Sequence, residues 1–276
     1  ILTIITAITL ISLLFTPLLM ADPDNVISFL PSDIHIELGQ NTTMNINCTI
    51  NDPCDTVAVD NLTFDGSVVT TQSANVTSGN LFENGSIDDI VTVDNTNGYI
   101  SSIVWANETL SAGTTGTLAN ITWQSVGCGV SEVQMTAGGT AYDGTANATV
   151  NHSCNITVHP QYPLETTSLA ESSSTINVSW TPRDGTDNVT LEVNTTSDTW
   201  ARGEGTELVN LSTDTWWYVD SELSPSTTYY YQVWSYNQTA NLYSLYNGSD
   251  NATTLDVPTI ATEVNLYGLT DTWNIT

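Results

Sequence analysis

Residues 148–158 read Ala-Thr-Val-Asn-His-Ser-Cys-Asn-Ile-Thr-Val, and apolar and polar side chains alternate along most of this stretch. A period of two is typical of a β-strand that buries only one of its faces. The apolar members share one parity: Ala148, Val150, Cys154, Ile156 and Val158. Asparagines at positions 147, 151 and 155 share the other parity, so we expect a strand whose wet face carries asparagine.

The same alternation recurs in both directions along the chain. Apolar residues oppose an asparagine in 119–123, 176–180 and 188–194, and no helical period follows residue 21. Turn-forming pairs such as Asp143-Gly144 and Asp184-Gly185 separate the patterned stretches. Many short strands between such turns favour antiparallel sandwiches, and 276 residues suit two of them. We therefore predict an all-β protein of two tandem β-sandwiches after an apolar N-terminal helix.

The charge of the chain is strongly one-sided. Asp and Glu number 30, against Arg183 and Arg202 as the only bases, which gives a formal charge of −28. Binding to nucleic acid needs clustered Lys and Arg, so this class of partner is excluded. We expect other surface proteins or polysaccharide as partners, and membrane contact only through the N-terminal segment or an anchor beyond residue 276.

Glycosylation sequons of the form Asn-x-Ser/Thr are unusually dense. They occupy 18 of 26 asparagines, whereas the Ser and Thr content alone predicts about seven. The acceptors are Asn41, Asn47, Asn61, Asn75, Asn84, Asn107, Asn120, Asn147, Asn151, Asn155, Asn177, Asn188, Asn194, Asn210, Asn237, Asn247, Asn251 and Asn274. This excess predicts an extracellular or cell-surface glycoprotein.

The two ends of the chain differ from its middle. Residues 1–20 are apolar and uncharged, and an acidic run follows Ala21. We expect a secretory signal peptide over 1–21, with a retained helical anchor as the alternative. Pro160 and Pro163 mark a linker over 160–167, and residues 257–276 are expected to begin a further, truncated domain.

The first module, residues 22–159, resembles the cohesin-like family. The resemblance depends on an opening strand with Ile34, Ile36 and Leu38, a second with Met44, Ile46 and Cys48, and later elements in family order: Leu62-Thr63-Phe64-Asp65, Val76-Thr77-Ser78-Gly79-Asn80-Leu81-Phe82, Asp94-Asn95-Thr96-Asn97-Gly98-Tyr99-Ile100 and Gly116-Thr117-Leu118-Ala119-Asn120-Ile121-Thr122-Trp123. It implies a nine-stranded jelly roll, related to carbohydrate-binding modules, that docks dockerin modules. The chain itself contains no dockerin calcium repeat, so a dockerin partner would be another protein.

The second module, residues 163–256, resembles fibronectin type III. Trp180 ends the stretch Ile-Asn-Val-Ser-Trp, as a core tryptophan of strand B would. The stretch Leu223-Ser-Pro225-Ser-Thr227-Thr-Tyr229 matches the signature before strand F, where Pro225 fixes the loop and Tyr229 forms a tyrosine corner. The resemblance implies a seven-stranded sandwich that serves as a spacer or adhesion module.

Four cysteines lie in the first module, and an even number in a secreted chain favours disulfides. A turn near residue 141 would bring Cys128 opposite Cys154. Cys48 would then pair with Cys54 across the turn at 51–53. The other two connectivities stay open.

The sequence contains no pattern for catalysis or a metal site. His35, His152 and His159 lie outside every catalytic motif, and no Cys-x-x-Cys or ligand-spaced histidine is present. We therefore predict a protein that is not an enzyme, without catalytic, cofactor-binding or metal residues. Loop calcium is a low-ranked alternative, with these candidate ligands: Asp22, Asp24, Asp88, Asp89 and Asp94.

Aromatic side chains are concentrated in the second module, beyond what one core needs. The candidates for exposed binding rings are Trp216, Trp217, Tyr230, Trp234 and Tyr236. The leading prediction is a non-enzymatic surface-layer or adhesion scaffold. The alternatives are a carbohydrate- or dockerin-binding part of a larger extracellular enzyme, and a pilin-like filament subunit.

Overall fold

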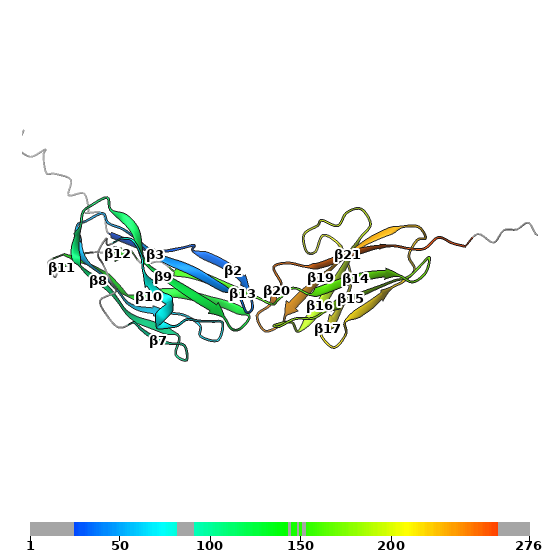
Figure 1. Ribbon diagram of the computed structural model, residues 1–276, viewed down its shortest axis with the longest axis horizontal. Helices are drawn as coiled ribbons and strands as arrows, with labels where there is room; N and C mark the ends of the chain where they lie inside the picture. Colours follow the sequence, from blue (N-terminus) through cyan, green and yellow to red (C-terminus); the bar gives the residue numbers. More distant parts are fainter. Residues whose placement is uncertain (1–24, 82–90, 143–144, 148, 151–152, 259–276) are drawn as a thin grey trace, which may run out of the picture. The chain divides into compact units, whose positions relative to one another are not determined.

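The computed structural model describes residues 25–81, 91–142, 145–147, 149–150 and 153–258. Within these residues the protein is all-β, apart from one 3₁₀ turn, η1 (Ser73–Asn75) (Figure 1). The chain divides into two compact units, one of residues 1–160 with 239–245 and one of residues 161–238 with 246–276. The first boundary lies inside the predicted linker. The predicted signal peptide, with its helix, lies outside the described residues.

The first unit is a sandwich of two sheets. One has the order β12–β1–β3–β9–β5, with β6 also paired to β9, and the other has the order β2–β13–β10–β4–β8–β7, with β11 also paired to β10. The strand bounds are β1 (Asn25–Leu30), β2 (Asp33–Glu37), β3 (Asn41–Thr49), β4 (Cys54–Thr63), β5 (Val69–Thr70), β6 (Val76–Ser78), β7 (Thr92–Asp94), β8 (Tyr99–Leu110), β9 (Thr115–Ser125), β10 (Gly129–Tyr142), β11 (Thr145–Asn147), β12 (Thr149–Val150) and β13 (Ser153–His159). The described residues of this unit form thirteen strands, of which five have only two or three residues, whereas the resemblance implied nine.

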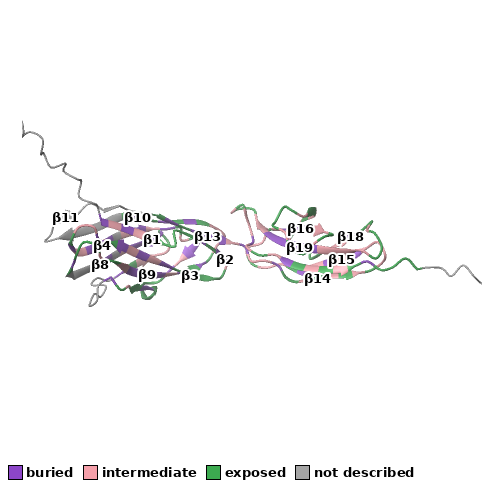
Figure 2. Ribbon diagram, turned by 90° about the horizontal axis from the view of Figure 1, so that it is seen from above, coloured by how far each residue is buried: buried purple, intermediate pink, exposed green. Residues whose placement is uncertain are grey.

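Buried residues occur along the strands of both sheets (Figure 2), and together they form one hydrophobic core. Met44 and Ile46 of β3 are fully buried, as their parity predicts. Trp123 of β9 is also fully buried, and its ring meets Phe64 edge-on at a centroid distance of 4.9 Å. Burial of each large apolar side chain stabilises the fold by about 1.5–3 kcal/mol.

The turn between β7 and β8 depends on glycine. Gly98 has a φ of +66°, which a side chain with a Cβ rarely adopts. A Cβ at this position would lie 2.0 Å from the carbonyl oxygen of Phe64. Phe64 N–H donates to the carbonyl of Gly98 at 2.9 Å, so the two backbones are in direct contact. The Asn97-Gly98 pair therefore fixes this turn against the chain after β4.

The second unit is a smaller sandwich. Its three-stranded sheet has the order β14–β15–β18, and its five-stranded sheet has the order β17–β16–β19–β20, with β21 also paired to β19. The strand bounds are β14 (Leu164–Ala170), β15 (Ile176–Thr181), β16 (Asn188–Asn194), β17 (Thr206–Ser212), β18 (Trp217–Asp220), β19 (Thr228–Asn237), β20 (Leu242–Tyr243) and β21 (Gly248–Thr253). Seven strands were expected, and eight are described in these two sheets; the two-residue β20 lies in the segment 239–245, which groups with the first unit.

The structural residues of this unit lie as the sequence predicts. Trp180 is 3% exposed and packs in the core with Val178. The hydroxyl of Tyr229 accepts a hydrogen bond from the backbone N–H of Ser224 at 3.0 Å, in the loop that contains Pro225. The predicted tyrosine corner is therefore confirmed.

No helix among the described residues is long and apolar enough to cross a membrane.

Candidate functional site

The sequon asparagines are the largest set of candidate functional residues. The structure describes the side chains of 13 of them, and none is buried. The structure does describe one buried asparagine, Asn25, whose side-chain oxygen accepts from the N–H groups of Asn51 and Asp52. Asn25 is not part of a sequon. The other five acceptors lie outside the described side chains: Asn84, Asn107, Asn147, Asn151 and Asn274.

The candidate binding aromatics are only partly exposed. Trp217 is the first residue of β18 and Trp216 precedes it; Trp216 is 62% exposed and Trp217 is 56% exposed. Tyr230 and Tyr236 of β19 are half-buried. The prediction for Trp234 was wrong, because this side chain is only 8% exposed.

Residues 195–205 form a loop that covers part of the five-stranded sheet of the second unit, so some side chains of outward parity are buried there. The buried carboxylate of Glu192 accepts from the indole N–H of Trp200 at 3.0 Å and from Gly203 N–H at 2.8 Å. The amide of Gln232, which lies opposite Glu192 in the sheet, donates to the carbonyls of Asp198 and Trp200. These bonds hold the loop against the outward face of β16 and β19, so polar side chains there are buried.

The cysteines do not have the expected register. In the antiparallel pair of β10 and β13, Cys154 lies opposite Val133, and Gly129 lies opposite Val158. The prediction that Cys128 lies opposite Cys154 was therefore wrong. β10 and β11 pair up to Tyr142 and Thr145, so residue 141 is still part of the paired strand and is not in the turn.

Cys48, Cys54 and Cys154 are buried thiols in this structure. Burial raises the pKa of Cys48 to about 12 and that of Cys54 to about 11, and the two groups are close enough to interact electrostatically. Cys154 donates to the carbonyl of Pro31 at 3.2 Å. The pairing of Cys48 with Cys54 stays a prediction.

Among the candidate calcium ligands, Asp94 is the one that the structure describes. Its carboxylate accepts from the backbone N–H groups of Thr96 and Asn97 and from the Asn97 side chain. The side-chain hydrogen bond from Asn97 is the first cause that lowers the pKa of Asp94. Its oxygens therefore serve the local turn. Within the described ranges, no group of three or more His, Cys, Asp or Glu side chains is placed to hold a metal ion.

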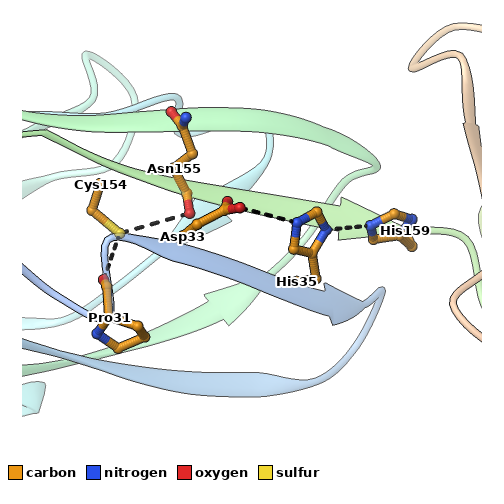
Figure 3. A network of polar contacts seen from close by, with 6 residues as sticks. All are labelled: Pro31, Asp33, His35, Cys154, Asn155 and His159. Carbon is orange, nitrogen blue, oxygen red and sulfur yellow. Dashed lines mark hydrogen bonds and ion pairs between the residues drawn. The ribbon is translucent and has the colours of Figure 1, made fainter.

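Two of the three histidines meet at one edge of the first unit (Figure 3). β2 and β13 pair in parallel, with His35 opposite Thr157 and His159 opposite Glu37. Nδ1 of His35 lies 2.8 Å from Nε2 of His159, and Nε2 of His35 lies 3.4 Å from a carboxylate oxygen of Asp33. The sequence did not predict this cluster. His152 lies outside the described residues.

The second histidine has a defined environment. Nδ1 of His159 lies 2.6 Å from the carbonyl oxygen of Tyr243, in the segment 239–245 that groups with the first unit. Burial lowers the pKa of His159, the carbonyl of Tyr243 opposes this shift, and the neighbouring His35 adds to it. Because a carbonyl oxygen can only accept, the hydrogen of the neutral His159 ring lies on Nδ1 and its lone pair on Nε2.

No protein-family model and no curated protein sequence matches this chain. Among solved structures, a chain of the CaDoc0917–CaCohA2 complex is 20% identical, with 49% of this chain and 99% of that chain covered and a TM-score of 0.37. An Fn3-like protein from Clostridium thermocellum is 20% identical, with 37% and 96% covered and a TM-score of 0.29. The chicken CNTN1 FN1-FN3 domains are 11% identical, with 85% and 69% covered and a TM-score of 0.31. The fold of each unit is therefore assigned from its own strand order.

Proposed function

We propose that this chain is a non-enzymatic, N-glycosylated scaffold or adhesion protein of the cell surface. The observation that carries the proposal is the position of the sequons: all 13 acceptor asparagines with described side chains reach the surface, while the buried Asn25 is outside any sequon. A glycan is bulky and hydrated and needs a surface acceptor. Sequons that arose by chance would not have to avoid buried positions.

The composition supports the same function. A chain with 30 acidic residues, two arginines and no lysine has a strongly negative charge, which keeps it hydrated and repels copies of itself. Sugar chains on both sandwiches would add a second hydrated layer. Two small sandwiches of this kind suit a spacer that presents such a coat.

Intact-mass measurement of the protein from its native source, before and after removal of glycans, tests the proposal. We expect a mass well above that of the polypeptide, and glycopeptide mapping should place sugars on the exposed acceptors Asn41, Asn75, Asn155, Asn210 and Asn251. A native protein without sugar on any of these sites would refute the proposal.

Asn188 and Asn210 make the mapping sharper, because their acceptor amides are in contact. Nδ2 of Asn188 donates to Oδ1 of Asn210 at 2.8 Å, and Nδ2 of Asn210 faces the hydroxyl of Thr190 at 3.3 Å. Thr190 completes the sequon of Asn188. A sugar on either amide would cover the other, so we expect one glycan per molecule on this pair. Asn210→Gln should raise the occupancy of Asn188 and leave that of Asn251 unchanged.

The exposed Trp216 and Trp217 favour a second candidate function, the binding of a carbohydrate. Indole rings stack on the apolar faces of sugar rings. A glycan array with the wild-type protein should then give signals that the double variant Trp216→Ala, Trp217→Ala loses. Tyr246→Ala, which removes another ring that is 61% exposed, is the control. A blank array would remove this candidate and leave the scaffold.

A further inference from the structure

The contact between His35 and His159 has an unusual arrangement of donors and acceptors. The two residues are 124 positions apart, their ring centroids are 5.1 Å apart and their planes are inclined by 38°. The nitrogens that face each other, Nδ1 of His35 and Nε2 of His159, are 2.8 Å apart. The His35 side chain is 48% exposed, so solvent reaches the pair. Figure 3 shows Asp33, His35 and His159 in one row.

The two nitrogens that face each other are the inner nitrogens of the pair, and the other nitrogen of each ring is its outer nitrogen. Each outer nitrogen lies beside an oxygen that can only accept a hydrogen bond. Nδ1 of His159 faces the carbonyl of Tyr243 at 2.6 Å, and Nε2 of His35 faces the carboxylate of Asp33 at 3.4 Å. The inner pair shares one hydrogen, because the lone pair of His159 Nε2 can accept it from Nδ1 of His35 at 2.8 Å. If this hydrogen leaves and Nε2 of His35 carries one instead, both inner nitrogens direct a lone pair at the space between them, which a cation can occupy.

The geometry points to a divalent transition-metal site in which Nδ1 of His35 and Nε2 of His159 are the protein ligands. Imidazole nitrogen is a preferred ligand of Zn²⁺ and Cu²⁺. The metal would take the place of the hydrogen that the two rings otherwise share. Asp33 and the Tyr243 carbonyl would then hold the outer N–H groups, which is how oxygen acceptors usually orient metal-bound histidines.

The required movement is small. Zn–N bonds of about 2.0–2.1 Å in a tetrahedral site place two ligand nitrogens about 3.3 Å apart. The pair must therefore open by about 0.5 Å from its present 2.8 Å. The half-exposed His35 and the Asp33 side chain, which is 63% exposed, are free to make this adjustment. Because the Tyr243 carbonyl holds the hydrogen of the neutral ring on Nδ1, Nε2 of His159 has the lone pair that a metal ligand needs.

The site would be open. Asp33 lies on the far side of the His35 ring, and the described part of the chain supplies no third side-chain ligand. Water would complete the coordination, so we expect moderate affinity and room for a ligand from another molecule. The formal charge of −28 raises the local concentration of cations around the site.

Calorimetric titration of the full chain with Zn²⁺, in a buffer with excess Mg²⁺, tests the site. Mg²⁺ prefers oxygen ligands and occupies the acidic surface without competing for imidazole. We expect one Zn²⁺ per chain for the wild type and a Kd at least tenfold higher for His35→Ala and for His159→Ala. His152→Ala is the matched control, since it removes the remaining histidine, and its Kd should equal that of the wild type.

Nitrogen-15 NMR of the imidazoles identifies the ligand atoms independently of affinity. On addition of Zn²⁺, the resonances of His35 Nδ1 and His159 Nε2 should shift, and those of His152 should not. Circular dichroism confirms that each variant is folded. Equal Kd values for the wild type and His35→Ala, or a shift of the His152 resonances alone, would overturn the proposal.

Discussion

Tyr231→Phe is the substitution for which the structure of the second unit gives the clearest expected cost. The Tyr231 hydroxyl donates to a carboxylate oxygen of Asp220 at 3.0 Å. The tyrosine is 1% exposed and the aspartate 6% exposed, so no water can replace the donor. Burial is the first cause that raises the pKa of Asp220, and the hydrogen bond from Tyr231 opposes it. Removal of the hydroxyl leaves this carboxylate with one donor fewer.

A hydrogen bond to a charged buried group contributes about 1.5–3 kcal/mol. We therefore expect Tyr231→Phe to lower the free energy of unfolding of the second unit by about 2 kcal/mol. With a urea m-value of about 1–2 kcal/mol/M for a domain of this size, the midpoint should fall by about 1–2 M. Hydrogen exchange of the β18 and β19 amides reports on this unit separately from the first.

The matched control is Tyr230→Phe, because Tyr230 is the preceding residue of β19 and is half-buried. Its midpoint should lie close to that of the wild type. If Tyr231→Phe also unfolds within about 0.5 kcal/mol of the wild type, the argument that this buried pair stabilises the sandwich is refuted.

Three further predictions concern Asp220, Gly98, and the pair of Cys48 and Cys54. The raised pKa of Asp220 means that this carboxyl binds its proton more tightly in the folded state than in the unfolded chain. Its contribution to the free energy of unfolding is therefore complete below the unfolded pKa of about 3.9 and is lost as the pH rises through the folded pKa. Asp220→Asn should therefore match the wild type at pH 3 and be more stable at pH 7, as urea titrations at both pH values will show; a constant difference would contradict this. Gly98→Ala should lower the free energy of unfolding by at least about 2 kcal/mol, because alanine is strained at this positive φ and its Cβ would clash with the Phe64 carbonyl. A Tm within about 2 °C of the wild type in thermal unfolding would exclude that clash. Cys48 and Cys54 should form a disulfide in protein that is isolated from an oxidising compartment. Mass spectrometry after alkylation of free thiols tests this pairing, and alkylation of both cysteines would reject it.

Much of the fold is predictable from the sequence, because each strand carries its own period of two. Met44, Ile46 and Trp180 point inward as expected, and Tyr229 returns its hydroxyl to the backbone as its motif predicts. These predictions depend only on neighbours within a few residues. The strand count was less predictable, since strands of two or three residues, such as β5, leave no periodic pattern.

Predictions that depend on long-range structure failed for identifiable reasons. Trp234 has outward parity but is only 8% exposed, and the neighbouring position of the same face, Gln232, is bonded to a loop that begins some 40 residues earlier in the chain. Cys154 lies opposite Val133 because the chain reverses beyond Tyr142, and a shift of the turn by two to three residues moves the opposing residue by five. Period-two patterning fixes which side of a strand faces inward, but it does not fix the register between strands.

The histidine pair shows how the same limit hides a functional site. Spacing rules for metal sites look for ligands that are close in sequence, as on one helix or in one turn. His35 and His159 meet only because β2 and β13 pair in parallel, with Ile34 opposite Ile156 and Ile36 opposite Val158 in the core. A shift of this register by two residues, so that His35 lies opposite Asn155, would keep every apolar side chain inside and move the two rings about 7 Å further apart. The cluster is therefore a consequence of register, and Zn²⁺ binding that depends on both histidines would test the register as well as the site.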